Sequence, residues 1–171
     1  MSRYLPGEDE IVRSSLNSAN SDTPDSLGYP DQIEGAGTRI PGMSQTVPEE
    51  AEALLTSEPL VAHLGTSQEN RPHVAPLWYN YRDDTVEIVT TGRKLENIQR
   101  NPRVALSVQK DEDGRPQWGV TLQGKAEVIE DDEEGREVLH RINRKYGVDE
   151  DAWSENTPVR IDVDTVKHWT Y

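Results

Sequence analysis

Residues 71–108 read RPHVAPLWYNYRDDTVEIVTTGRKLENIQRNPRVALSV, and this stretch decides the fold. Alternating side chains over residues 74–81 and again over 86–90 predict two β-strands, because successive residues of a strand point to opposite faces. The polar run Arg82-Asp83-Asp84 between them predicts a tight turn. A short amphipathic helix is expected to begin near residue 93 and to end at Asn101-Pro102, where a third strand starts.

The junction between the second strand and this helix has the composition of a phosphate site. Thr90 and Thr91 offer hydroxyl groups, Gly92 allows close approach of the backbone, and Arg93 and Lys94 follow at once. The start of a helix also leaves backbone N–H groups free to bind an anion. The alternative is that the two cations are ordinary solvated residues. Cations are unfavourable in a first helical turn unless an anion is present, which favours the phosphate site.

The distribution of charge points to the same place. The chain of 171 residues has a net charge of −14, yet residues 71–108 hold six basic and four acidic side chains. A locally electropositive region in an acidic protein can attract a small anionic ligand without recruiting polyanions. Non-specific binding to nucleic acid is not expected, because it depends on neutralising phosphates with many cations. An anionic membrane surface is not expected as a partner for the same reason.

These motifs, in their order and spacing, resemble the pyridoxamine 5'-phosphate oxidase-like, FMN-binding split-barrel superfamily. The resemblance runs from about Pro48 to the C-terminus and rests on the segments 71–78, 90–94 with Asn97, 101–104 and 120–127. It implies a mainly β (α+β) fold, a six-stranded antiparallel split β-barrel with flanking helices. It further implies a homodimer that holds FMN or a deazaflavin at the subunit interface.

The resemblance also implies roles for individual residues. Arg93 and Lys94 would contact the cofactor phosphate, with Thr90 and Thr91 as further donors, and Asn97 would brace the loop. The remaining cofactor-binding candidates are main-chain contacts to the ring system from Pro76, Leu77 and Trp78, ring-flanking indoles from Trp118 and Trp169, and a contact from Gln123.

The sequence departs from true pyridoxamine-phosphate oxidases. Residues 71–76 read RPHVAP where those enzymes carry an Arg-x-Val-Leu-Leu-Lys-like strand, and residues 167–171 read KHWTY where they carry an Arg-Leu-x-Pro-like segment. The expected function is therefore an FMN-binding oxidoreductase that transfers hydride between flavin and a small organic acceptor. The alternatives are a reductase dependent on the deazaflavin coenzyme F-420 and a non-catalytic carrier of flavin or haem, haem being the weaker expectation.

Composition sets the remaining limits. Residues 1–47 are rich in Ser, Asp, Pro and Gly without apolar period, which predicts a flexible, disordered acidic tail. Residues 48–171 form the one expected domain. An acid excess with few lysines suggests a high-salt cytoplasm, where dissolved salt screens the mutual repulsion of the carboxylates. No apolar run is long enough to cross a bilayer and no leader is evident, so a cytoplasmic protein is expected.

The rest of the domain offers little catalytic chemistry. The chain has no Cys, and its four His are spread out, so no metal site is expected and no catalytic residue is assigned. His73 lies beside the predicted cofactor strand and is the partial exception. Helices are expected over about 48–58 and 131–146, a hairpin turn over 111–114, and a strand from Trp118 to Ile129 with Gly124 where it bends or meets another backbone.

Overall fold

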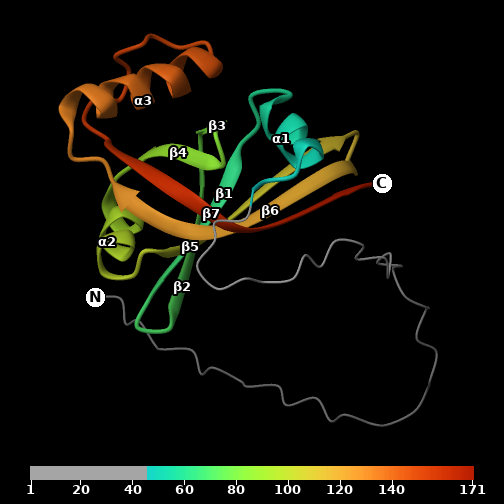
Figure 1. Ribbon diagram of the computed structural model, residues 1–171, viewed down its shortest axis with the longest axis horizontal. Coiled ribbons are helices and arrows are strands. Elements are labelled where there is room, and N and C mark those ends of the chain that lie inside the picture. The colour runs from blue at the N-terminus through green and yellow to red at the C-terminus, as the bar shows by residue number, and fades with distance from the viewer. Residues whose placement is uncertain (1–45) are drawn as a thin grey trace, which may run out of the picture. The chain divides into compact units, whose positions relative to one another are not determined.

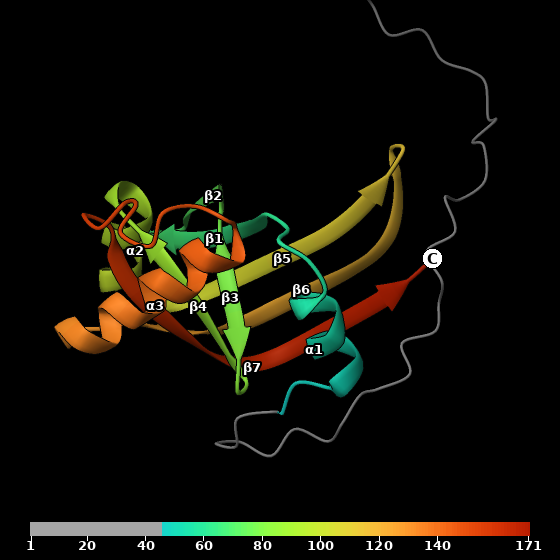
Figure 2. The same ribbon diagram turned by 90° about the horizontal axis from the view of Figure 1, so that it is seen from above.

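A computed structural model describes residues 46–171, and Figure 1 and Figure 2 show a twisted antiparallel sheet flanked by helices. In chain order the elements are α1 (Glu49–Thr56), β1 (Ala62–Gln68), β2 (Arg71–Leu77), β3 (Tyr79–Arg82), β4 (Thr85–Thr90), α2 (Gly92–Arg100), β5 (Arg103–Glu112), β6 (Arg115–Val128), α3 (Asp132–Lys145) and β7 (Thr157–Thr170). The predicted fold class, mainly β with flanking helices, is confirmed.

The sheet has seven strands in the order β2-β1-β5-β6-β7-β4-β3, and it is not closed. Six were expected; the seventh arises because the strand predicted across residues 74–81 breaks at Trp78. Before the break Leu77 pairs with Ala62 of β1, and after it Tyr79 pairs with Ile88 of β4. Because β2 and β3 form the two edges of the sheet, the chain passes from one edge to the other at Trp78, and the gap between these edges is the split of the barrel.

Three hairpin turns are made as their sequences predict. Each turn places two consecutive residues at positive φ, which matches the right-handed twist of the flanking strands. The pairs are Glu69 and Asn70, Asp83 and Asp84, and Asp113 and Gly114. Polar residues and glycine tolerate this conformation, so local chemistry alone fixes these connections.

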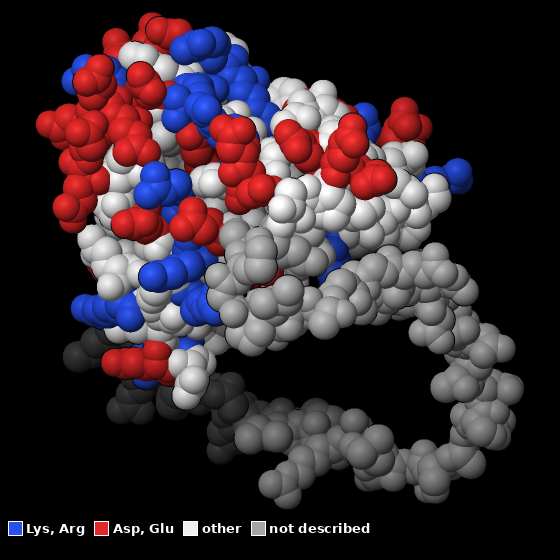
Figure 3. Space-filling view, viewed as in Figure 1, with Lys and Arg blue, Asp and Glu red and all other residues white. Residues whose placement is uncertain are grey.

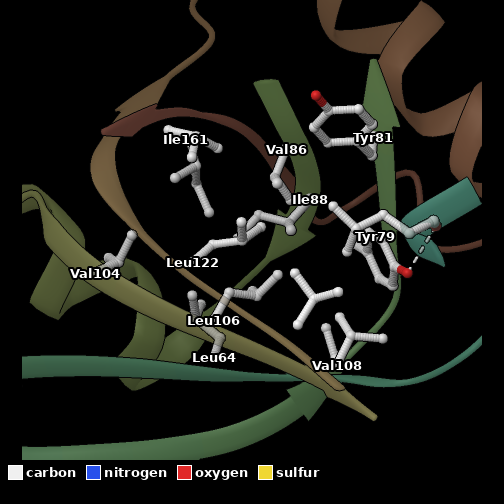
Figure 4. Close-up of a cluster of buried hydrophobic side chains, with 14 of the residues drawn as sticks. Leu64, Tyr79, Tyr81, Val86, Ile88, Val104, Leu106, Val108, Leu122 and Ile161 are labelled. Atoms are coloured by element: carbon white, nitrogen blue, oxygen red, sulfur yellow. Dashed lines mark hydrogen bonds between the residues drawn. The ribbon is translucent and has the colours of Figure 1, made fainter. Parts of the chain in front are cut away.

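The core fills the inner face of the curved sheet. Alternate residues of each strand point inward, among them Leu64 of β1, Ile88 of β4 and Leu122 of β6, and all three are buried. Figure 4 shows these side chains converging from strands far apart in the sequence. Tyr79 is fully buried, and its hydroxyl donates to the carbonyl of Leu55 in α1 at 2.9 Å, which ties α1 to the sheet.

Gly124 marks the sharpest irregularity in the sheet. The register between β6 and β7 shifts between Gln123 and Gly124, which is a β-bulge. A Cβ at position 124 would overlap the carbonyl oxygen of Asp162 and lie 3.0 Å from Cγ2 of Ile161. The prediction that another backbone approaches this glycine is therefore confirmed.

Helix α3 covers the outer face of β4 and β3. Asp131 caps it by accepting from the backbone N–H of Glu134 at 2.8 Å, and Gly147 ends it at φ +69°. Arg141 of α3 makes two hydrogen bonds to the buried carboxylate of Glu87 in β4, at 3.0 and 2.6 Å. The helix is thereby fixed on the sheet by a two-pronged ion pair as well as by apolar contacts.

The predicted tail, residues 1–47, lies outside the described residues except for its last two. Val47 is buried, and its backbone N–H donates to Asp84 Oδ1 at 2.6 Å, so the folded domain begins at least one residue before Pro48.

Candidate functional site

The start of α2 has the features of an anion site. Thr91 is extended, its side chain makes no capping hydrogen bond, and no acidic residue lies in the first turn. Gly92 adopts φ +60°, with nothing within 4 Å of the position of a Cβ, so the backbone there is open to a ligand. Arg93 is exposed and Lys94 is half-buried, and within residues 46–171 neither makes an ion pair. The N–H groups of this turn and two free cations therefore face solvent together.

Thr90 adds a second, independent sign of a ligand. It is the last residue of β4 and is only 2% exposed. Its hydroxyl is buried and makes no hydrogen bond to any residue that the structure describes. A buried hydroxyl without a partner is costly, and it identifies a donor that a bound oxyanion could use.

The other two helices are built in the opposite way. Helix α1 has Glu49, Glu50 and Glu52 in its first turn, and α3 has Asp132, Glu133 and Glu134. Such acids complement the positive end of the helix dipole. In Figure 3, Asp and Glu gather over the start of α3, Lys and Arg gather over its other end, and both kinds appear in the region of α2. Among the described helices, α2 alone has no acidic side chain in its first turn, so a bound anion could supply the negative charge there.

Asn97 holds the helix rather than facing its open end. Its side chain is buried and its Nδ2 donates to the hydroxyl of Thr66 in β1 at 3.0 Å. Asn101, just after the helix, donates from Nδ2 to the carbonyl of Ser67 at 3.0 Å. Both amides hold α2 against the end of β1.

Strand β2 provides an open backbone edge. Among the described strands it pairs with β1 alone, so within residues 46–171 the N–H and C=O groups along its other edge have no strand partner. Pro72 and Pro76 fit such a strand because they lack an N–H. The side chain of Trp78 turns away to stack on Tyr146 of α3, with ring centroids 4.5 Å apart and planes 7° apart. The indole of Trp78 is thus engaged within the subunit, which leaves its main chain to contact a ligand.

The outer face of the sheet carries a groove of about 450 Å³. Strand register places Gln123 and Trp169 on this outer face. The indole of Trp169 lies across Gly119, and its buried Nε1 makes no hydrogen bond within residues 46–171. Among the groove's lining residues are His63, Val74, Ser107, Thr121, Gln123 and Lys167.

Trp118 is not brought to this face. It precedes Gly119 in β6, so it points inward, where it is 8% exposed and belongs to the core. The structure thus separates the two tryptophans expected to flank the ring: Trp169 lies outside and Trp118 inside. In a single subunit Trp118 has the position of a packing residue.

Two residues at the end of α3 were not expected at the site. The Lys145 ammonium lies 3.8 Å from the centroid of the Tyr79 ring and donates to the carbonyl of Leu55 at 3.3 Å. Burial lowers the pKa of Lys145 to about 8. Tyr146 follows it, and no local pattern in the sequence distinguishes the Tyr146 hydroxyl from that of any other tyrosine at a helix end.

Other kinds of site find no support in the described part of the chain. No group of three or more His, Asp or Glu side chains in residues 46–171 is arranged to hold a metal ion. Within the same range no helix is both long and apolar enough to cross a membrane.

Comparison with known proteins identifies the family of this chain. The sequence profile of the pyridoxamine 5'-phosphate oxidase family matches residues 48–168. This chain therefore belongs to that family. No curated protein matches it.

Solved structures with the same fold carry different descriptions. An FAD-binding protein from Mesorhizobium loti is 27% identical over 70% of this chain and 89% of its own, with a TM-score of 0.59. A structure described as an F420 reductase is 25% identical over 71% of this chain and 98% of its own, with a TM-score of 0.57. The haem storage protein HutZ from Vibrio cholerae, at 17% identity over 71% and 93% and a TM-score of 0.60, shares the fold alone. Family and fold together support a flavin-binding protein.

Proposed function

We propose that this protein binds FMN and transfers hydride between the flavin and a small organic acceptor, as a homodimer with the flavin at the subunit interface. The observation that carries the proposal is the start of α2. There two unpaired cations and an unpartnered buried hydroxyl surround a helix N-terminus without acidic residues. A phosphate monoester would supply the missing negative charge and accept from all these donors.

The phosphate end would be held by residues 90–94. Thr90 Oγ1 and the N–H groups after Thr91 would donate to it, and Arg93 and Lys94 would add positive charge. Asn97 keeps this helix in place through Thr66. Because the donors are fixed before the ligand arrives, little ordering is needed on binding.

The ring end would lie against the free edge of β2. Pro76, Leu77 and Trp78 would offer main-chain contacts along that edge, and their conformation is set by β1 on one side and α3 on the other. Gln123 and Trp169 stand on the outer face of the sheet, where a second subunit would bring further walls. The free Nε1–H of Trp169 is a donor suited to a ring carbonyl.

A bound flavin supplies the hydride chemistry, and the chain itself orients the ring, shields it from water and fixes the phosphate. No residue is assigned a catalytic role. The acceptor is proposed only as a small organic molecule.

Two alternatives have a specific observation behind them. The 25% identity to an F420 reductase favours coenzyme F-420, which also combines a phosphate with a tricyclic ring. The absence of an assigned acid–base pair favours a carrier that binds flavin without turnover. A haem carrier has less support, because His73 is only half-buried on β2 and His168 is exposed.

Titration with FMN, coenzyme F-420 and haem would separate these possibilities. The expected result is saturable binding of FMN, with one flavin per subunit and a perturbed visible spectrum. If neither FMN nor F-420 binds, the proposal fails. A Soret band that disappears in His73→Ala or His168→Ala would establish the haem carrier instead.

Turnover separates enzyme from carrier. Bound flavin should bleach with a reduced nicotinamide and recover on addition of an acceptor such as a quinone. Tight binding with no change on either addition would favour the carrier. Gel filtration with light scattering tests the homodimer, and a monomer that still binds FMN tightly would refute the interface location.

A further inference from the structure

The strand pairing changes between β2 and β3 at Trp78, and the side chain of Tyr146 lies beside this break. Leu77 ends its pairing with β1 and Tyr79 begins its pairing with β4, so the residue between them has no strand partner. A backbone at such a crossing depends on other groups for its hydrogen bonds.

Tyr146 supplies one such bond, at the residue that follows the break, and its ring contacts the side chain of Trp78. Its hydroxyl accepts from the backbone N–H of Tyr79 at 3.3 Å and donates to the carbonyl of Leu60 at 2.5 Å. Its ring stacks on the indole of Trp78, and Trp153 closes the stack edge-on, with its centroid 5.1 Å from that of Trp78. One phenol thus joins the end of α3, the approach to β1 and the start of β3.

The hydroxyl keeps its proton over the whole working range. Burial raises the pKa of Tyr146 to about 12, so the bond to the Leu60 carbonyl persists at neutral and mildly alkaline pH. Both ring and hydroxyl are therefore permanent constraints on the residues beside Trp78.

We propose that Tyr146 is a positioning residue of the flavin site, which fixes the backbone of residues 76–78 in the conformation that receives the ring. The inference rests on the proposed function, because it takes the open edge of β2 as the ring site. Tyr146 need not touch the flavin, because it would act through its contacts with Trp78 and with the backbone N–H of Tyr79. A backbone segment that already has its bound conformation binds a ligand more tightly, because less conformational freedom is lost on binding.

Tyr146→Phe is the test, since it removes the hydroxyl and keeps a ring to stack on Trp78. Loss of one backbone anchor should raise the dissociation constants of FMN and riboflavin alike, by about two- to tenfold. The ratio of the two constants should stay the same, because the phosphate end is untouched. The absorption bands of the bound flavin should also change shape, which a change in overall stability would not produce.

Tyr79→Phe is the matched control. It removes the buried Tyr79 hydroxyl, which donates to the carbonyl of Leu55. The backbone N–H of Tyr79 and the stack of Trp78 on Tyr146 stay intact. It should lower the free energy of unfolding while flavin affinity and spectrum, measured well below the melting temperature, stay those of wild type.

The outcomes separate the inference from the proposed function. Wild-type protein that binds no flavin overturns both. Wild-type binding, with Tyr146→Phe indistinguishable from Tyr79→Phe, overturns the positioning role alone. Should Tyr146→Phe not fold, Trp78→Phe decides, because it alters the same stack from the other side and is expected to weaken both flavins equally; unchanged affinity there also refutes the role.

Discussion

Replacing Lys94 with alanine tests the phosphate site directly. Lys94 is half-buried at the start of α2 and makes no ion pair within residues 46–171, so its expected partner is the ligand. A charge-assisted hydrogen bond contributes about 1.5–3 kcal/mol, which corresponds to roughly a ten- to 150-fold increase in the dissociation constant for FMN. Riboflavin lacks the phosphate and should bind wild type and Lys94→Ala alike.

Stability without ligand should move the other way. An unpaired cation at a helix N-terminus is unfavourable by roughly 0.3–1 kcal/mol, so the apo variant should melt at the wild-type temperature or slightly above it. Isothermal titration with the two flavins and melting curves of the two apo proteins measure these quantities. Lys125→Ala, at an exposed position of β6, is the matched control and should change neither. Equal losses for FMN and riboflavin, or no loss for FMN, would refute the assignment of residues 90–94.

Three further predictions concern the fold. Gly124→Ala should cost about 1–3 kcal/mol in urea unfolding, because its Cβ would overlap the backbone of β7, whereas Gly65→Ala, with ordinary contacts of 3.5 Å or more, should be nearly neutral. Arg141→Met should cost about 3–5 kcal/mol by leaving the buried Glu87 carboxylate without its cation, with the hydrogen bond from Asn80 Nδ2 as its remaining side-chain partner; a loss below 1 kcal/mol would mean that solvent reaches the carboxylate. The pKa of Lys145 is about 8 in the folded protein and higher when unfolded, so the unfolded state binds more protons between about pH 8 and 10.4. The free energy of unfolding should therefore rise from pH 8 to 9.5 relative to that of Lys145→Met, and a constant difference would contradict the lowered pKa.

Local chemistry made much of the fold predictable. Paired polar residues at the turns, acids at two helix starts and Gly147 at a helix end each specify a conformation within a few residues. The start of α2 was predictable for the same reason, because it depends on the few residues around Gly92, and the anion site at residues 90–94 stays a prediction. Alternation likewise identified the strands, and the glycine at 124 identified the bulge.

What depends on register between distant strands was not predictable. Trp118 and Trp169 point to opposite faces because Trp169 pairs with Gly119, and no single strand contains that information. The break at Trp78 has the same origin: alternation continues through residues 77–79, while the hydrogen-bonding partner changes from β1 to β4. The proposed positioning role of Tyr146 depends on the location of this break, so it was not predictable from the local sequence either.

The site therefore combines two kinds of support that respond differently to mutation. At the proposed phosphate end the stabilising partner would be the ligand, so binding would relieve the unfavourable charge arrangement of the apo protein. At the proposed ring end the partners are internal, since Tyr146 bonds the N–H of Tyr79 and the carbonyl of Leu60 without a flavin. Changes at residues 90–94 should consequently separate affinity from stability, whereas changes at the Trp78 stack should alter both together. Because any ligand that binds only the folded state adds RT ln(1 + [L]/Kd) to its stability, the first group loses stability only in the presence of FMN. A substitution that weakens flavin binding without lowering apo stability therefore identifies a ligand-binding residue. One that lowers both identifies a residue that stabilises the folded protein.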